Sequence, residues 1–367
     1  MKLSCNRSAL ERALAIVTGV VSSRTPREVL KCARLTAKDD QVVLVGTDLE
    51  VGVRCVVAQV EVERVGDILV SAEKLAQIVR ELSDEVVVLE ADAGLLHLRG
   101  DGSHFQVYGQ DPAEYPAVAE FEGPADVEVT AAVLRHLMEC TVFAAAREST
   151  RYAINGVLWE RKGKKLQMVA TDGRRLAKCV GGVKSCSEQP LSVIVPPKTL
   201  TLLQRVAQTV EGEEDALVRA APNQLLVRIG PVTVASVLVE GHFPKHEEVI
   251  PRDNPIRVAF RTSELYGAVR RAALLTNNES KGIRMELGAN RLVLSARAPE
   301  EGEATVHMTI AYEGRPLTIG FNPGFLADAL RVVGTEEVSL ELSEATKPGV
   351  LTAGKEFTYV IMPVSLA

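Results

Sequence analysis

Two short stretches of the chain contain side chains that could do chemistry. The first, Ser71-Ala72-Glu73-Lys74, has the S-x-x-K spacing that places a nucleophilic serine beside a lysine in penicillin-recognising enzymes. The S-D-N and K-T-G sequences of those enzymes do not occur in this chain. Because a serine before an amphipathic run is also a typical helix cap, we interpret Ser71 as a cap and keep an enzymatic site there as the alternative.

The second stretch contains His242 and His246, followed by Glu247 and Glu248, and it resembles a metal site. An H-E-x-x-H site needs both histidines on one helix, and Pro244 between them prevents that helix, so we interpret these as loop residues. The chain also lacks the phosphate-binding patterns G-x-x-x-x-G-K-[ST] and G-x-G-x-x-G and the nucleophile pattern G-x-S-x-G. We therefore predict no catalytic residues, no metal and no cofactor.

The elements that would position any functional side chain form an internal repeat. A short strand pattern, a capping residue and an amphipathic helix follow one another six times. The six half-repeats are Lys2–Val17, Ile68–Leu82, Val127–Ala146, Ser192–Gln208, Ile256–Leu275 and Leu317–Val333. The predicted caps are Ser71, Thr130, Thr262 and Asn322, the last followed by Pro323 at the first helical position. Between the helices, apolar residues alternate with a period of two, which predicts several strands per helix.

Two half-repeats form one unit, and three units fill the 367 residues. Turn-rich stretches at 122–124 and 251–255 predict domains at residues 1–123, 124–252 and 253–367. The segment ending at Asp48 aligns with the segment ending at Asp172, as expected for repeated domains. Helices on one face of antiparallel sheets indicate an α+β fold. A tandem array of this kind leaves end strands unpaired, and closure into a ring is one way to remove those edges.

Charge is unevenly distributed between the helices and the rest of the chain. The net charge is −6, but segments 7–17, 72–82, 131–147, 196–208, 262–275 and 323–333 hold eleven Lys or Arg and six Asp or Glu. These helices therefore carry +5 and the remainder −11. If the helices share one face, that face would attract phosphate without reading bases. The alternative is that Lys and Arg are simply good helix formers on solvated faces.

The composition, with 46% hydrophobic and 25% charged residues, is typical of a globular protein. There is no apolar run of roughly 18–20 residues and no hydrophobic signal region after Met1-Lys2, so we expect a cytoplasmic protein. The six cysteines are scattered without a C-x-x-C pair, and we expect them to be reduced core residues.

Six segments, in register from end to end, resemble the bacterial DNA polymerase III β subunit family, the DNA sliding clamps. They are Gly46-Thr47-Asp48-Leu49-Glu50, Arg151-Tyr152-Ala153-Ile154-Asn155-Gly156, Ala170-Thr171-Asp172-Gly173-Arg174-Arg175-Leu176-Ala177, Gly241-His242-Phe243-Pro244, Ile319-Gly320-Phe321-Asn322-Pro323 and Tyr359-Val360-Ile361-Met362-Pro363. The resemblance implies the DNA clamp fold: a head-to-tail homodimeric ring with three similar domains per chain, encircling duplex DNA with helices lining the hole.

The resemblance also implies a non-catalytic processivity factor without cofactors. Such clamps tether the polymerase III α subunit, other polymerases and repair proteins to DNA through a clamp-binding peptide, and an ATP-driven clamp loader opens and loads them. The implied peptide pocket is Ile154, Thr171, Gly173, Arg174, Arg175, Leu176, Pro244, Val249, Pro348, Val360, Ile361, Met362, Pro363 and Val364. The implied DNA-facing residues are Arg24, Arg80, Tyr152, Lys198 and Arg205, and the helix charges add Arg147. The implied dimer interface is Phe105, Val107, Leu274 and Leu275.

Three positions depart from the family pattern. Many members have a basic residue where Glu248 stands, an aromatic residue where Ala153 stands and a basic residue where Pro197 stands. These departures affect the pocket rim and part of the DNA path, so partner preference can differ from that of other members. A clamp-like scaffold that keeps the peptide pocket without working on DNA is the remaining alternative.

Overall fold

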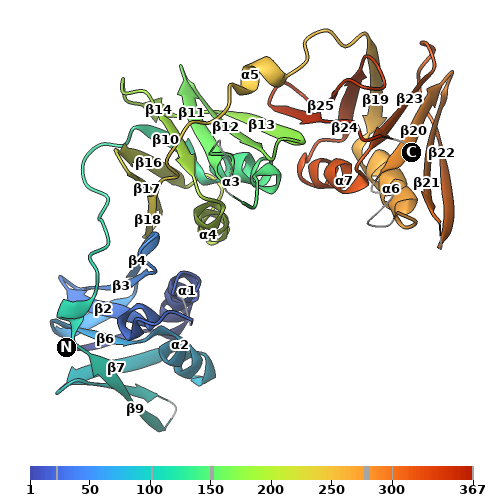
Figure 1. Ribbon diagram of the computed structural model, residues 1–367. Helices are drawn as coiled ribbons and strands as arrows, with labels where there is room; N and C mark the ends of the chain where they lie inside the picture. The colour runs from blue at the N-terminus through green and yellow to red at the C-terminus, as the bar shows by residue number, and fades with distance from the viewer. Residues whose placement is uncertain (22–23, 101, 149–152, 277–281, 300, 366–367) are drawn as a thin grey trace. The chain divides into compact units, whose positions relative to one another are not determined.

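The computed structural model describes residues 1–21, 24–100, 102–148, 153–276, 282–299 and 301–365 (Figure 1). They group into two compact units. The first unit is Met1–Arg135, Val183–Leu191 and Lys198–Leu238, and the second is His136–Gly182, Ser192–Pro197 and Val239–Ala367. The central third of the chain thus contributes strands to both units.

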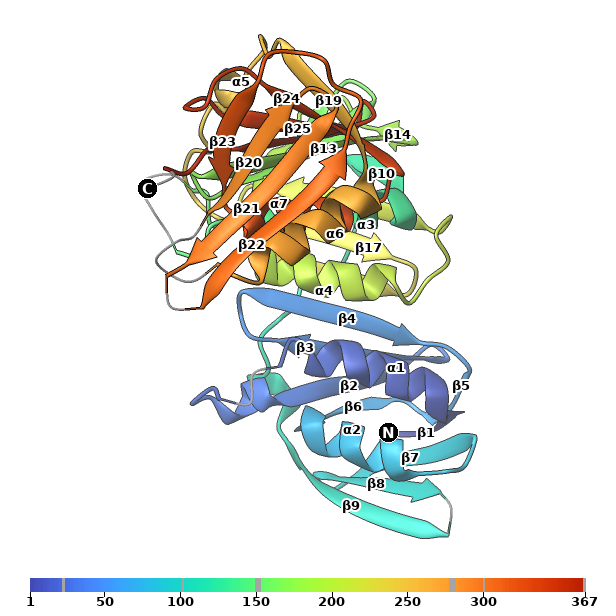
Figure 2. The same cartoon turned by 90° about the vertical axis from the view of Figure 1, so that its right-hand side faces the viewer.

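The first unit is built on a 14-stranded antiparallel sheet in the order β14-β10-β16-β17-β18-β4-β3-β2-β6-β9-β8-β7-β1-β5. Its strands are β1 (Lys2–Asn6), β2 (Cys32–Lys38), β3 (Gln41–Thr47), β4 (Val51–Val57), β5 (Val60–Arg64), β6 (Gly66–Ser71), β7 (Val86–Asp92), β8 (Leu95–Gly100), β9 (Ser103–Gln110), β10 (Val127–Thr130), β14 (Ser185–Cys186), β16 (Asp215–Ala221), β17 (Gln224–Ile229) and β18 (Val232–Val237). Helices α1 (Arg7–Thr18) and α2 (Ala72–Glu81) pack side by side, with α1 also against β3 and β4 (Figure 2). Most of α4 (Pro197–Ala207) belongs to this unit.

The second unit contains an 8-stranded and a 4-stranded sheet, in the orders β15-β11-β12-β13-β26-β25-β24-β19 and β22-β21-β20-β23. The strands are β11 (Val157–Lys162), β12 (Lys165–Thr171), β13 (Arg175–Gly182), β15 (Ser192–Val195), β19 (Ile256–Arg261), β20 (Ile283–Gly288), β21 (Arg291–Ala298), β22 (Gly302–Thr309), β23 (Leu317–Phe321), β24 (Glu337–Leu342), β25 (Gly349–Ala353) and β26 (Phe357–Ile361). Helix α6 (Thr262–Ala273) packs against α7 (Pro323–Val332), β21 and β22, and α3 (Ala131–Glu139) and α5 (His246–Val249) complete the helices described.

The predicted α+β class and all six predicted helices are confirmed, as α1, α2, α3, α4, α6 and α7. Each buries one apolar stripe; in α2, for example, Leu75 and Val79 are fully buried. The caps Ser71, Thr130 and Asn322 accept hydrogen bonds from backbone N–H groups of the first turns of α2, α3 and α7.

The predicted cap at Thr262 is wrong. Helix α6 begins at Thr262 itself, after Arg261, whose side chain makes no capping hydrogen bond. The Thr262 side chain is buried, and its hydroxyl has no hydrogen-bond partner among the described residues. The sequence also missed the cap of α1, Asn6, whose Oδ1 accepts from the Ala9 N–H at 3.0 Å.

The alignment of Asp48 with Asp172 appears in the structure as one turn built twice. After β3, the Thr47 hydroxyl donates to the Val51 carbonyl at 2.9 Å and accepts from the Leu49 N–H at 3.0 Å. Asp48 Oδ1 accepts from the N–H groups of Glu50 and Val51. These bonds hold Leu49 at φ +80°.

After β12 the same turn recurs with Thr171 and Asp172. The Thr171 hydroxyl donates to the Arg175 carbonyl at 2.6 Å and accepts from the Gly173 N–H at 3.1 Å, and Asp172 Oδ1 accepts from the N–H groups of Arg174 and Arg175. The residue at the positive φ of +85° is here Gly173. Glycine adopts this conformation without steric cost, whereas Leu49 does not.

We expect Leu49→Gly to raise the free energy of unfolding by about 1 kcal/mol, because a left-handed conformation costs an L-residue about that much. The Leu49 side chain is exposed, so little apolar burial is lost. Urea unfolding followed by circular dichroism measures the change. The matched control is Leu49→Ala, which keeps the conformational cost; equal stability of the two variants would contradict the explanation.

Candidate functional site

An apolar wall forms where β13 lies beside β26 in the second unit. Leu176 pairs with Val360 in register, and both side chains are buried. They pack in one cluster whose other members are Ala153, Leu158, Val169 and Ile194, with the partly buried Val239, Phe243 and Ile250 against it. Two residues of the predicted pocket, Leu176 and Val360, thus belong to this cluster. The sequence analysis did not assign Val239, Phe243 or Ile250 to this pocket, although Phe243 lies in one of the segments that resemble the family.

The chain beyond β26 forms the rim of this wall. The Met362 N–H donates to the Arg174 carbonyl at 2.9 Å, and the Val364 N–H donates to the Gly320 carbonyl at 2.9 Å. Pro363 lies between them, and β26 ends at Ile361. The Met362 side chain is 44% exposed, so it offers a flexible apolar surface that adapts to different ligands.

Other predicted pocket residues differ in how accessible they are. The Ile361 side chain is fully buried, so it packs in the core and is not available on the surface. Pro348 directly precedes Gly349, which pairs with Ile361, so it lies beside the end of β26. Val249 is exposed at the end of α5, Pro244 is half-buried just before that helix, and Ile154 is buried.

Arg175 fixes the turn that forms the other edge of the wall. Its guanidinium donates to Asp172 Oδ2 at 3.0 Å, to Asp328 Oδ2 at 2.7 Å and to the Phe143 carbonyl at 2.6 Å. It also lies 4.3 Å from the ring centroid of Phe325. Arg175 therefore joins the Thr171–Arg175 turn to α7, and its role is to hold the turn, since only 10% of its side chain is exposed.

The charge of Arg175 is secured by these neighbours. Burial acts to lower the pKa of Arg175, but the hydrogen bond to Asp328 and the nearby hydroxyl of Tyr359 outweigh it and raise that pKa above its ordinary value. The guanidinium is therefore charged at neutral pH. Next to it, Arg174 and Gly173 are exposed, so this edge presents backbone and one further cation to solvent.

Two of the predicted DNA-facing residues, Lys198 and Arg205, come together in the first unit. They lie one above the other on α4 and line a cavity of about 200 Å³ together with Gly19, Val20 and Val51. The Lys198 ammonium pairs with the carboxylate of Asp48 in the repeated turn, an ion pair that the sequence did not reveal. Part of the Lys198 charge is therefore already neutralised, while Arg205 is exposed.

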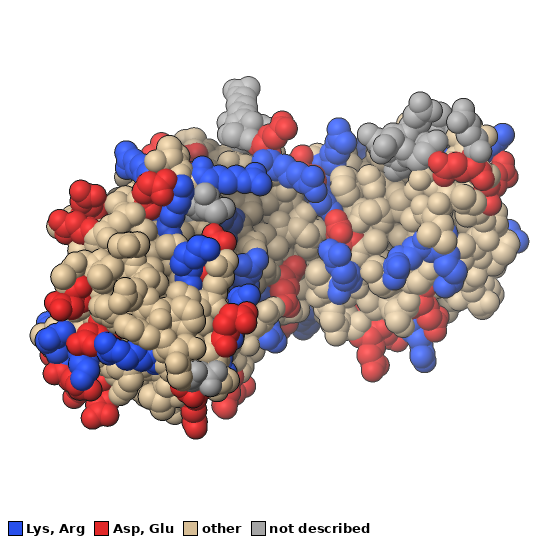
Figure 3. All heavy atoms as spheres, turned by 90° about the horizontal axis from the view of Figure 1, so that it is seen from below, with Lys and Arg blue, Asp and Glu red and all other residues tan. Residues whose placement is uncertain are grey.

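Of the other predicted DNA residues that the structure describes, none lines this cavity. Arg80 is exposed on α2, Arg24 is exposed beyond α1, and Arg147 is exposed in the second unit. Tyr152 lies outside the described residues. Figure 3 shows one face of the molecule, on which Lys and Arg side chains lie close together in several places, with Asp and Glu side chains among them as well as at the margins.

The predicted interface residues lie on or beside sheet edges. Phe105 and Val107 are half-buried on β9, which pairs with β6 only at Gly109 and Gln110, so the rest of β9 has one strand neighbour among the described residues. In the second unit, β22 is the outer strand of its sheet. Leu274 follows α6 and is 77% exposed, while Leu275 is half-buried.

The residues considered for catalysis have other roles. The Ser71 hydroxyl caps α2, and Lys74 Nζ hydrogen-bonds to Gln77 rather than to Ser71. His246 begins the four-residue helix α5, so its prediction as a loop residue is wrong, whereas His242 lies in a loop. His246 is buried, and burial lowers its pKa. Of the described helices, none is long and apolar enough to cross a membrane.

Family models match nearly the whole chain. They are described as the DNA polymerase III beta subunit N-terminal domain, over residues 1–119, its central domain, over 128–245, and its C-terminal domain, over 247–365. Among curated proteins, the beta sliding clamps of Pseudomonas aeruginosa and Escherichia coli (strain K12) are 33% and 30% identical, each comparison covering 100% of both chains.

Solved structures show the same likeness. The crystal structure of the DNA polymerase III subunit beta from Pseudomonas aeruginosa superposes with a TM-score of 0.93 at 33% identity, over 100% of both chains. The DNA polymerase sliding clamp from Bacillus subtilis superposes with a TM-score of 0.94 at 26% identity, also over 100% of both chains.

Proposed function

Since the chain belongs to the family of bacterial DNA polymerase III β subunits, the β sliding clamps, we propose that it encircles duplex DNA as a ring and tethers polymerases to it. It is a non-catalytic processivity factor of DNA replication. The proposed ring is a head-to-tail homodimer of six domains, opened and loaded by an ATP-driven clamp loader in the cytoplasm. The division of each chain at residues 123 and 252 stays a prediction.

The observation that carries this proposal is the distribution of positive charge over the repeated helices. Exposed basic side chains occur on helices of different half-repeats, including Arg12, Arg80, Arg205, Arg270 and Arg331. Such charges attract phosphate in any sequence context, which is what a sliding protein needs. The remainder of the chain is acidic and would discourage binding elsewhere.

Retention on circular duplex DNA tests the proposal. The full chain is incubated with its clamp loader, ATP and a nicked circle at moderate salt, and bound protein is separated by gel filtration before and after the circle is cut. We expect retention on the circle that is lost after linearisation, because a ring slides off a free end. Equal retention on both forms would indicate an ordinary DNA-binding protein, and retention on neither would indicate a scaffold that does not work on DNA.

We further propose that the wall formed by Leu176, Val360 and Met362 binds the linear peptide of partner proteins. Support comes from its composition: aliphatic side chains for apolar anchors, a flexible methionine at the rim and the exposed backbone of Gly173 beside it. The polymerase III α subunit, other polymerases and repair proteins are the proposed partners. Because Glu248 stands where many members have a basic residue, we expect a preference for peptides with fewer acidic residues at that rim.

The proposed dimer contact joins the free edge of β9 to β22 of a second chain, with Leu274 and Leu275 beside it. Pairing would remove two exposed strand edges at once. It would also cover Leu274 and the half-buried Phe105 and Val107.

Leu274→Asp is expected to weaken dimerisation by at least about 30-fold, because a charged side chain would be placed in an apolar contact. The fold of the single chain should be unchanged, since Leu274 is exposed there. Sedimentation equilibrium measures the dissociation constant. Val65→Asp, at an exposed valine between β5 and β6, is the matched control; equal effects of the two substitutions would remove Leu274 from the interface.

A further inference from the structure

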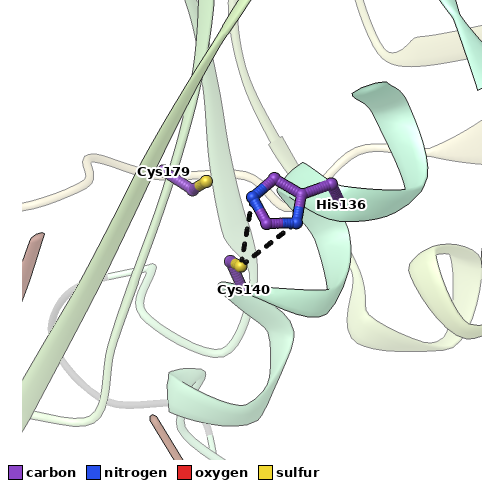
Figure 4. Close-up of side chains that lie close together, drawn as sticks. All are labelled: His136, Cys140 and Cys179. Atoms are coloured by element: carbon purple, nitrogen blue, oxygen red, sulfur yellow. Dashed lines mark hydrogen bonds between the residues drawn. The ribbon is translucent and has the colours of Figure 1, made fainter. Parts of the chain in front are cut away.

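One cluster of chemically reactive side chains lies outside every surface described above. His136 on α3, Cys140 directly after it and Cys179 on β13 point toward one another (Figure 4). Their possible ligand atoms all lie within 4.8 Å of one another. Both cysteines are fully buried, whereas His136 is half-buried.

The backbone brings these residues together by two separate means. The Cys140 N–H donates to the His136 carbonyl at 3.0 Å, so the last helical turn places residues four apart on the same face. Cys179 is contributed by the middle of β13, where it pairs with Met168 and with Phe357. The Cys140 thiol also lies 3.5 Å from the carbonyl of Val332, the last residue of α7. The cluster therefore lies where α3, β13 and α7 meet.

We propose that His136, Cys140 and Cys179 bind one thiophilic divalent cation of the Zn²⁺ class. Two thiolates and one imidazole are ligands typical of Zn²⁺, with bond lengths of roughly 2.3 Å to sulfur and roughly 2.0 Å to nitrogen. In a tetrahedral site such ligands are roughly 3.5–3.8 Å apart, which follows from those bond lengths. Both ring nitrogens of His136 are 3.7 Å from Cys140 Sγ, so this pair already has the required separation.

The surroundings favour a cation. The carboxylates of Glu139 and Glu356 act on His136 and add negative potential to the cluster. His136 forms the partly exposed side, through which a cation can enter and at which water completes a fourth coordination position. A bound ion would link α3 to β13 and stabilise the second unit, because it would bind the folded chain and not the unfolded one. Neither the DNA surface nor the peptide wall is needed for this binding.

Cobalt substitution tests the site. The full chain is purified with a phosphine reductant, stripped with a chelator and titrated with Co²⁺, which gives thiolate-to-metal charge-transfer absorption and strong visible bands in a tetrahedral sulfur site. We expect one equivalent to bind, Zn²⁺ to displace it, and Zn²⁺ to raise the thermal midpoint of the wild type. Cys140→Ser and Cys179→Ser should each weaken Zn²⁺ binding at least about 100-fold, because each removes a direct ligand.

Two further variants keep the test decisive if a buried cysteine cannot be replaced without unfolding. His136→Gln removes the nitrogen ligand from the half-buried side and should weaken Co²⁺ and Zn²⁺ binding, while the thiolate charge-transfer band still appears at saturating Co²⁺. Cys186→Ser, at the exposed cysteine of β14, should leave the spectrum and the Zn²⁺ affinity unchanged. The proposal is overturned if the wild type shows no saturable cobalt spectrum, if the ligand variants bind as the wild type does, or if Cys140 and Cys179 are recovered as a disulfide under reductant.

Discussion

Arg175→Ala is expected to lower the free energy of unfolding of the second unit by about 3 kcal/mol. The substitution removes three hydrogen bonds of a buried guanidinium and leaves the carboxylates of Asp172 and Asp328 without their shared cation. It also removes the contact with the Phe325 ring. For a unit of this size, the thermal midpoint should fall by roughly 6–12 °C.

The same substitution should weaken binding of a clamp-binding peptide, because Arg175 holds the turn that borders the apolar wall. Fluorescence anisotropy of a labelled polymerase peptide, at a temperature where the variant is folded, measures this effect. Arg174→Ala is the matched control, since the Arg174 side chain is exposed and should change stability by less than about 0.5 kcal/mol. If both variants lost stability equally, the network around Arg175 would not be the cause.

If the proposed DNA contacts are right, the protein should bind a short linear duplex weakly at low salt, and reversal of three charges, Arg24→Glu, Arg80→Glu and Arg205→Glu together, is expected to abolish this binding. Each lost phosphate contact reduces the slope of log affinity against log salt concentration by about 1, so the slope should fall by about 3. All three side chains are exposed, and stability should therefore change little.

The matched control reverses the same number of charges away from the helices, at Lys164, Lys347 and Lys355, which are exposed in turns between strands. Fluorescence anisotropy at several salt concentrations compares the two triple variants. If net charge alone governed binding, both would lose affinity equally. Loss in the Arg24, Arg80 and Arg205 variant alone would assign the binding to these predicted DNA-facing residues and would exclude a scaffold that has no function on DNA.

Much of the fold follows from local sequence patterns. The apolar spacing in the six helices is set by the 3.6-residue turn and does not depend on distant residues, so all six were predictable. The caps Ser71, Thr130 and Asn322 were predictable for the same reason: each accepts from N–H groups two or three residues ahead. Thr262 was not, because its side chain is turned into the core.

The sites depended more strongly on tertiary structure. The family motifs indicated Leu176, Val360 and Arg175, but the partners of Arg175 in α7, the ion pair of Lys198 with Asp48 and the contribution of Phe243 result from long-range packing. The cluster of His136, Cys140 and Cys179 shows most clearly what could not be predicted from the sequence alone. Helix geometry alone puts His136 and Cys140 on one face, whereas Cys179 reaches them only because the register of β13 against β12 and β26 fixes which of its side chains face α3. Contacts between residues that are close in the sequence can be predicted from the sequence alone. Strand register depends on which side chains are buried across the whole unit, so only the tertiary structure shows it.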